Sequence, residues 1–278
     1  MTQYIILNKL DELFSFINEA QSKGFKYVII SGGTDLTLKW RKNSEYLHNY
    51  DYVLDISYIR ELQNFIVNEE FIYIGAVVKI EELMEKQHIL YDFPALIDAL
   101  SVFATWHIRN MATIGGSIMS NRSLTIKVPL ALYSALIDVI NPHGKRQINL
   151  IDILSGKEKI NQHEIISGIM IKKGKNINYN CSSYVELKNN LLPLIGSAAL
   201  ITDNNITLSI GTLLNDKLRI YYNKVMVRIF KDKDLNEICN VINYDEIVHI
   251  LGISNKYLED SLHRKICESI NKALARCK

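Results

Sequence analysis

The chain has 278 residues, 48% of them hydrophobic, enough for a substantial core and for two domains or one domain with a smaller lobe. Its 32 basic and 30 acidic residues give a net charge of +2, so no overall field favours a nucleic acid or an anionic membrane as partner. The four cysteines form no CxxC or CxxH pair, which argues against a zinc site or an iron–sulfur cluster held by this chain alone.

The N-terminal segment, MTQYIILNKLDELF, lacks the basic stretch and following apolar run of a secretion signal. No apolar run elsewhere approaches the roughly 20 residues that a membrane span requires. The sequence therefore predicts a cytoplasmic protein without a membrane segment.

The first elements predicted are a short strand, a helix and a second strand. Asn8 is a candidate N-cap of the helix, and Gly24 is placed to end it. Apolar residues between them recur at i, i+3, i+4 and i+7 and predict one buried face: Leu10, Leu13, Phe14 and Ile17. A β-rich run over residues 27–30 predicts a strand that leads directly into the loop Ser31-Gly32-Gly33-Thr34-Asp35.

Further elements alternate between strands and helices. Strands are predicted at residues 52–56, 65–67, 71–74, 135–140, 146–150 and 165–171, and helices at residues 81–88, 92–103 and 128–134. Residues 172–176 are a linker candidate. Beyond them we expect antiparallel strands at residues 183–187, 194–202 and 206–211, then mostly helix, ending in an amphipathic helix marked by Leu258, Leu262, Ile266, Ile270 and Leu274.

A second glycine pair, Gly115 and Gly116, follows Thr113 in the stretch TWHIRNMATIGGSIMSN of residues 105–121. Glycine pairs allow backbone N–H groups to approach a phosphate without a Cβ in the way, although a lone pair is more often an ordinary tight turn. Two such loops, each following an apolar run and carrying a threonine, suggest a pyrophosphate held between two turns. Neither loop has the P-loop lysine, which argues against a nucleoside-triphosphate site.

Other polar residues near these loops have competing interpretations. His107 and Arg109 more often orient a loop or face a partner than perform chemistry, and Trp40 and Trp106 are packing or interface candidates. Asp35 either binds ligand hydroxyls or caps its own turn. No Ser/His/Asp or Cys/His signature supports a hydrolase, so no catalytic residue is predicted.

Together these segments resemble the FAD-binding (medium) subunits of the molybdenum hydroxylases, such as xanthine dehydrogenase and carbon monoxide dehydrogenase. The resemblance runs nearly end to end and is carried by residues 30–36 (ISGGTDL, family AGGTDL), residues 74–76 (family IGA) and residues 108–116 (IRNMATIGG, family IRNxATIGG). It implies an α+β fold: a two-subdomain FAD-binding unit of the vanillyl-alcohol-oxidase (PCMH/VAO-like) type over residues 1–173, divided at about 1–55 and 56–173. A small α+β C-terminal domain with a three-stranded antiparallel sheet plus helices would follow over residues 177–278.

The resemblance also implies which residues contact FAD. The first loop would surround the pyrophosphate and ribityl chain, the second stretch would supply hydroxyl and N–H donors, and single residues elsewhere would complete the site. The full set is Ile29, Ile30, Ser31, Gly32, Gly33, Thr34, Asp35, Leu36, Phe103, Thr113, Gly115, Gly116, Ser117, Ile166 and Lys188. No metal ligand and no general acid or base in this chain is implied.

Two positions depart from the family pattern. Ile126 stands where the family has an aspartate that contacts the adenosine end of FAD, and Glu186 stands where it often has a lysine. Lys188, two residues further on, is a candidate to reach the same region. A cation beside the flavin stabilises its anionic reduced form, whereas a carboxylate opposes it.

The function implied is that of an FAD subunit in a multi-subunit enzyme. Substrate would be oxidised at molybdopterin on a large subunit, electrons would cross iron–sulfur (2Fe–2S) clusters on a small subunit, and FAD on this chain would pass them to NAD or another acceptor. Two alternatives stay open: a scaffold or assembly subunit with weak or no FAD binding, and a stand-alone flavin oxidoreductase. The departures at Ile126 and Glu186 favour the scaffold alternative. We further expect Gly32→Val or Gly115→Val to abolish FAD retention with the fold intact.

Overall fold

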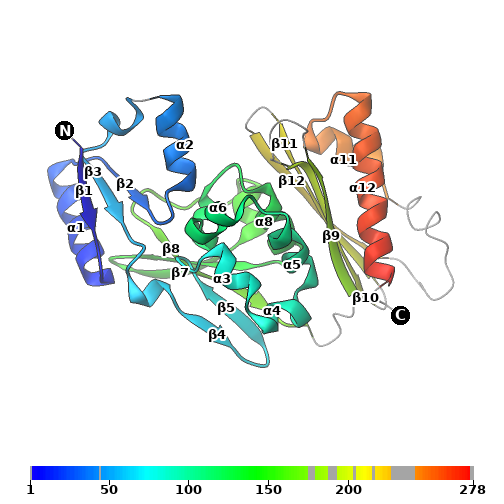
Figure 1. The fold of residues 1–278 in the computed structure, drawn as a ribbon, viewed down its shortest axis with the longest axis horizontal. Helices are drawn as coiled ribbons and strands as arrows, with labels where there is room; N and C mark the ends of the chain where they lie inside the picture. The colour runs from blue at the N-terminus through cyan, green and yellow to red at the C-terminus, as the bar shows by residue number, and fades with distance from the viewer. Residues whose placement is uncertain are drawn as a thin grey trace.

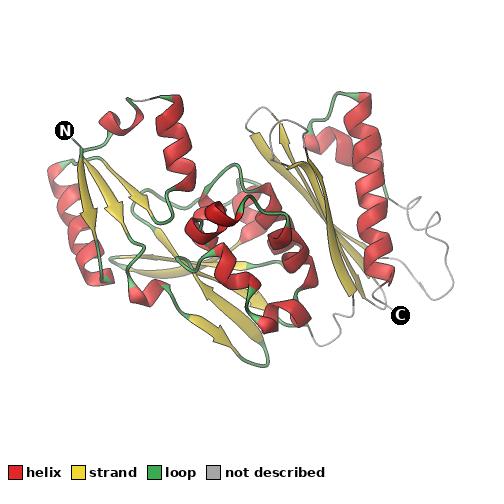
Figure 2. Cartoon of the chain, in the orientation of Figure 1, coloured by secondary structure: helices red, strands yellow, loops and turns green. Residues whose placement is uncertain are grey.

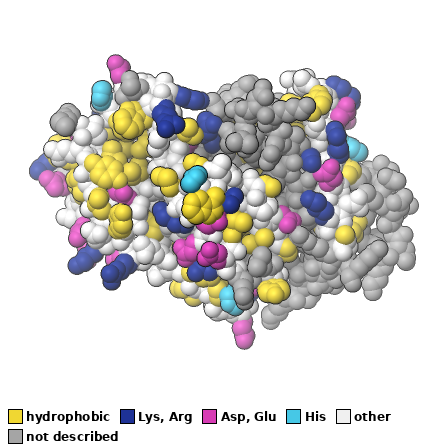
Figure 3. All heavy atoms as spheres, in the orientation of Figure 1, with side chains coloured by type: hydrophobic (Ala, Val, Ile, Leu, Met, Phe, Trp, Pro, Cys, Tyr) yellow, Lys and Arg dark blue, Asp and Glu magenta, His cyan; other side chains and the backbone are white. Residues whose placement is uncertain are grey.

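The computed structural model describes residues 2–43, 45–174, 179–186, 193–202, 205–214, 217–226 and 242–275. Three sheets follow one another along the chain and along the long axis of the molecule, from the N-terminal sheet to the C-terminal one (Figure 1). On the face drawn in Figure 3, side chains of both charges are interspersed, in keeping with the small net charge.

The N-terminal sheet is parallel, with strand order β1-β3-β2. Its elements are β1 (Gln3–Ile6), α1 (Leu10–Lys23), β2 (Tyr27–Ile30), α2 (Thr34–Lys42), a 3-10 turn η1 (Tyr46–Asn49) and β3 (Tyr52–Asp55). Helix α1 buries Leu13 and Ile17 as predicted, and Gly24 ends it in the left-handed region with φ of 72°. The N-cap is Lys9 and not Asn8, since the Leu13 N–H donates to the Lys9 carbonyl at 3.3 Å. The Glu12 carboxylate accepts the Asn8 N–H at 2.9 Å.

The middle sheet has strand order β4-β5-β8-β6-β7 and is antiparallel throughout. Its strands are β4 (Phe65–Val67), β5 (Phe71–Gly75), β6 (Leu136–Asn141), β7 (Gly144–Asn149) and β8 (Ile165–Lys172). The accompanying helices are η2 (Arg60–Leu62), α3 (Ile80–Met84), α4 (Gln87–Asp92), α5 (Pro94–Ser101), α6 (Trp106–Met111), α7 (Ile114–Met119), α8 (Leu124–Leu132) and α9 (Leu150–Leu154). All nine residues of α8 are buried, so this helix lies in the interior of the molecule.

The C-terminal sheet is antiparallel, with strand order β12-β11-β10-β9. Its elements are β9 (Tyr179–Glu186), β10 (Pro193–Thr202), β11 (Asn205–Leu214), β12 (Lys217–Met226), α11 (Tyr244–Leu251) and α12 (Lys256–Ala275). The three expected strands are present, and β12 adds a fourth where we expected mostly helix. Among the side chains described in this strand, Leu218 and Ile220 alternate toward the core beside α8.

Helices cover both faces of the C-terminal sheet (Figure 2). Helix α12 packs on one face and buries Leu262, Ile266 and Ile270, as its sequence pattern predicted. Helices α5 and α8 pack on the other face. Among the described residues, no helix is both long and apolar enough to cross a lipid bilayer. The domain boundary near residue 173 stays a prediction.

Candidate functional site

The first glycine loop forms the uncapped start of helix α2. Gly33 occupies the N-cap position with φ of 67°, a conformation that favours glycine, and no side chain caps the helix. The first helical bond runs from Thr37 N–H to the Gly33 carbonyl at 2.9 Å, so the amides of residues 34–36 have no acceptor within the helix. In the described part of the chain, the amides of Gly32 and Gly33 donate to no other residue either. This loop therefore presents a run of unpaired N–H donors.

The second glycine stretch is helical and its amides are already used. Thr113 caps α7 by accepting the Gly116 N–H at 3.2 Å, Gly115 donates to the Ala76 carbonyl at 2.9 Å, and Ser117 donates to the Thr113 carbonyl at 2.9 Å. These internal hydrogen bonds disfavour the expectation that this stretch supplies N–H donors to a ligand, which stays a prediction. The hydroxyl-bearing residues of this stretch that line the pocket are Thr113 and Ser117, and the Ser117 hydroxyl has no partner among the described residues.

The glycines of the two stretches allow the backbone segments to pack closely. A Cβ on Gly32 would collide with the carbonyl oxygen of Met111, and one on Gly115 would lie 2.7 Å from the Cβ of Ala76. Both collisions involve groups close to the backbone, which cannot swing away. The expectation that valine at Gly32 or Gly115 leaves the fold intact is therefore wrong.

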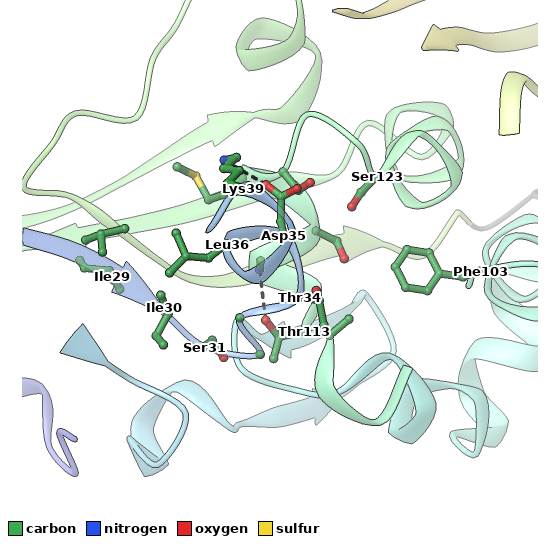
Figure 4. A pocket seen from close by; sticks show the side chains of 18 of the residues that line it. Ile29, Ile30, Ser31, Thr34, Asp35, Leu36, Lys39, Phe103, Thr113 and Ser123 are labelled. Carbon is green, nitrogen blue, oxygen red and sulfur yellow. Dashed lines mark hydrogen bonds and ion pairs between the residues drawn. The ribbon is translucent and has the colours of Figure 1, made fainter. Parts of the chain in front are cut away.

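The two stretches meet around a pocket of about 250 Å³, here called the α2 pocket. Figure 4 shows its labelled lining from Ile29 and Ile30 on one side to Phe103 on the other. Of the residues predicted to contact FAD, the α2 pocket brings together Ile29, Ile30, Ser31, Gly32, Gly33, Thr34, Asp35, Leu36, Phe103, Thr113, Gly116 and Ser117. Sequence reasoning missed other lining residues, among them Lys39, Tyr46, Met119, Ser120 and Ser123.

A second pocket of about 340 Å³, here called the β8 pocket, adjoins the first. It shares Ser31, Gly116 and Met119 with the α2 pocket, so the two pockets are neighbours and are here together called the cleft. The remaining predicted residues Gly115 and Ile166 line this part. Lys188 lies outside the described residues.

Two buried oxygen atoms of the first loop have no hydrogen-bond partner among the described residues. These are the Ser31 hydroxyl oxygen and Oδ1 of Asp35. The other carboxylate oxygen of Asp35 pairs with Lys39 Nζ at 3.0 Å, as Figure 4 shows. Asp35 thus does not cap its own turn, which was one of the two roles considered for it. Buried polar groups left unpaired are costly, and a bound ligand that supplies their partners relieves that cost.

Lys127 is a buried cation behind this pocket that sequence reasoning did not single out. It lies within α8, only 3% exposed, and its Nζ donates to the carbonyl oxygen of Ser120 at 2.7 Å. Burial lowers the pKa of Lys127 to about 8, while the Asp35 carboxylate acts in the opposite direction. The sequence feature that could have pointed to Lys127 is its position inside an otherwise apolar helical run. Ile126, at the family's aspartate position, is fully buried in the core.

Two ion pairs orient residues that line the cleft. Arg109 pairs with Glu81 and donates from Nη1 to the Phe103 carbonyl at 3.3 Å, so it orients the segment that carries Phe103. At the β8 pocket, Arg146 donates to both carboxylate oxygens of Glu164 at 2.9 Å and lowers the pKa of Glu164. These contacts fix lining residues and do not by themselves indicate chemistry. Trp106, 58% exposed, stays an interface candidate.

The cleft fits an extended ligand with an anionic centre. Unpaired amides at the start of a helix bind phosphate oxygens, because both the free N–H groups and the helix dipole favour negative charge there. The unpaired Ser31 hydroxyl and the apolar wall at Ile29, Ile30 and Ile166 suit the rest of a dinucleotide. FAD, with a diphosphate between two ring systems, has this chemistry.

Comparison with known proteins identifies the class. Residues 1–172 match the family described as the FAD binding domain in molybdopterin dehydrogenase, and the chain belongs to this family. Among curated relatives, it is 28% identical over 141 residues to the xanthine dehydrogenase FAD-binding subunit of Escherichia coli O157:H7, a match that covers 50% of this chain and 47% of the relative. It is also 28% identical over 163 residues to the nicotinate dehydrogenase FAD-subunit of Eubacterium barkeri, covering 55% and 53%. The chain thus matches about half the length of these relatives.

Solved structures confirm the predicted fold class over the whole chain. A chain of carbon monoxide dehydrogenase from Hydrogenophaga pseudoflava superposes with a TM-score of 0.82 at 15% identity, covering 100% of this chain and 98% of the other. A chain of quinoline 2-oxidoreductase from Pseudomonas putida 86 gives a TM-score of 0.81 at 16% identity, covering 100% and 99%. At these identities the likeness concerns the fold alone.

Proposed function

We propose that the chain is the FAD-binding subunit of a multi-subunit molybdenum hydroxylase. Membership of the FAD-binding family and likeness to the solved chains over the full length support this role. When bound, FAD would supply electron transfer between iron–sulfur clusters on a small partner subunit and an acceptor such as NAD, while a large subunit with molybdopterin would oxidise the substrate. The chain's own task is to bind and orient the cofactor.

The observation that carries the proposal is the concentration of unsatisfied donors on one wall of the cleft. The amides of residues 32–36 would hold the diphosphate at the start of α2, and the hydroxyls of Ser31 and Ser117 would add neutral hydrogen bonds. Phe103 would close the α2 pocket, while Ile166 would provide an apolar wall in the β8 pocket. Lys188 is included as an FAD contact in this proposal on the basis of the family resemblance alone.

A visible absorption spectrum and an FAD titration of the purified full chain test the proposal. We expect flavin absorption as purified, or uptake of one FAD per chain by calorimetry. A colourless chain that takes up no added FAD would instead support the scaffold alternative.

A charge placed at the start of α2 locates the site. Thr34→Glu puts a carboxylate beside the unpaired amides, where it suits the helix dipole but repels a diphosphate. We expect it to weaken FAD binding by at least about tenfold with no loss of thermal stability. The matched control is Thr37→Glu, which adds the same charge to the same helix at an exposed position. Equal FAD affinity in both variants would place the cofactor elsewhere.

A further inference from the structure

Lys127 holds an ammonium group in the interior with most of its hydrogen-bonding capacity unused. Of its three N–H donors, one is accounted for by the Ser120 carbonyl, and it has no other partner among the described residues. Ser120 and Ser123, which precede it in the chain, both line the α2 pocket. The carboxylate of Asp35, which also lines that pocket, is the charge that acts on it. The ammonium group therefore lies directly behind the pocket wall.

We propose that Lys127 is a positioning residue of the α2 pocket, whose positive charge offsets the Asp35 carboxylate and sets the affinity of the pocket for the diphosphate of a dinucleotide. This inference rests on the proposed function. It assigns a role to a residue that does not itself line the pocket and that acts through the field behind Ser120.

Charge balance explains why such a group is needed. Asp35 lies in the first turn of α2, where its negative charge would repel a diphosphate held by the neighbouring amides. Lys39 neutralises one side of this carboxylate at 3.0 Å, but its side chain is 51% exposed, so water screens its charge. Lys127 is shielded from water, so its field at the pocket is screened far less.

Lys127 is expected to lose its proton at a pH only slightly above neutral. Its pKa is lowered to about 8, so it is mostly protonated at neutral pH and mostly neutral above about pH 9. FAD affinity should therefore fall as the pH rises through about 8. Besides Asp35, the charged side chains described on elements packed against α8 are Asp98 on α5, Asp152 on α9 and Arg219 on β12.

The test measures the affinity of the full-length chain for FAD, and for ADP as a probe without the flavin, at about pH 7 and about pH 9.5. At pH 7, Lys127→Met should bind both ligands about tenfold more weakly than wild type, and its affinity should not change with pH. Wild type should weaken with rising pH until it equals Lys127→Met. Lys127→Arg, which stays charged at both pH values, should keep the higher affinity throughout.

Stability controls separate this role from a structural one. Removing a buried charge for an apolar side chain of similar size is often neutral or stabilising, so Lys127→Met should unfold no earlier than wild type. If it fails to fold, the absence of pH dependence in Lys127→Arg carries the test. Wild-type affinity in Lys127→Met at pH 7, or an unchanged pH slope in either variant, would overturn the inference while leaving FAD binding established. A wild-type chain that binds no FAD would remove the proposed function and this inference together.

Discussion

Gly32 is required by the backbone that faces it. A Cβ there would collide with the Met111 carbonyl oxygen, at the point where the α2 loop meets the end of α6. We expect Gly32→Ala to lower the free energy of unfolding by about 3 kcal/mol, because a backbone carbonyl cannot move aside as a flexible side chain can. Urea denaturation monitored by circular dichroism measures this. Gly144→Ala is the control, since no atom lies within 4 Å of its added Cβ.

Equal midpoints for the two alanine variants would mean that the α2 loop and α6 are not in contact in solution. The expected result also separates two reasons for a glycine pair. From the sequence, Gly32 and Gly115 indicated a close approach to phosphate, and each of them lines one of the two pockets. Their immediate physical role is the close packing of two chain segments, which depends on Met111 and Ala76 and cannot be read from either motif alone.

Side-chain burial explains which features of single residues could not be predicted from the sequence. Ser31 and Asp35 were predicted at the site from their motif, but only the structure shows that their buried oxygens lack partners. Lys127 was not predicted at all, because a lysine in a sequence is most often exposed. Its burial results from the packing of α8 against the C-terminal sheet and the helices α5, α7 and α9, which is a property of the whole fold.

The first turns of α2 and α7 differ in how their backbone amides are hydrogen-bonded, although a glycine pair lies at the start of each. α2 has no cap and unpaired amides, whereas α7 is capped by Thr113 and tied to the Ala76 carbonyl. FAD at about 100 times its Kd should therefore slow hydrogen exchange in residues 32–36, by up to about 100-fold. The amides of residues 115–117 should change little, because they are already hydrogen-bonded. Exchange measured by mass spectrometry, with and without FAD, compares the two segments.

Equal slowing in both segments, or slowing at residues 115–117 alone, would contradict this asymmetry. It would restore the view, held from the sequence, that both glycine stretches donate amides to the ligand. The sequence could not decide the point, since the acceptor for Gly115 comes from Ala76 in a distant segment.

Elements with strong local signals were predicted closely. α1 and β2 follow from hydrophobic period and a terminal glycine, and β2 has the expected bounds of Tyr27–Ile30. α7 was expected to be a loop, because a glycine pair is a poor helix former. Its turn and a half is stabilised by the Thr113 cap and by the tertiary bond from Gly115 to Ala76. β12 was missed for a similar reason, since pairing with β11 and not its own pattern defines it.

At the scale of the whole molecule, α8 joins the pocket to the C-terminal sheet. Its N-terminal residues lead from Ser123 in the α2 pocket, and Leu124 and Val128 face Gly211 of β11. Gly211 is paired in register with Gly196 of β10, so the sheet presents small residues where the helix approaches. Ala198 and Leu213, from the same sheet, belong to one core cluster with α8 and the middle sheet. The C-terminal sheet and the FAD-binding unit thus share a core.

A larger side chain at Gly211 tests this shared core. The first added carbon would collide with the Leu124 side chain and lie 3.0 Å from Val128 Cγ2, and α8 is too fully buried to yield freely. We expect Gly211→Val to lower the free energy of unfolding by about 2–3 kcal/mol and to weaken FAD binding, because a displaced α8 carries Ser123 and Lys127 with it. The matched control is Ser209→Ala, two residues away on the same strand, which removes a buried hydroxyl without a partner among the described residues and should not destabilise the chain. Calorimetry on both variants gives stability and affinity together. If Gly211→Val loses stability but keeps wild-type FAD affinity, the sheet supports the fold without positioning the cleft; if it loses neither, the sheet does not rest on α8.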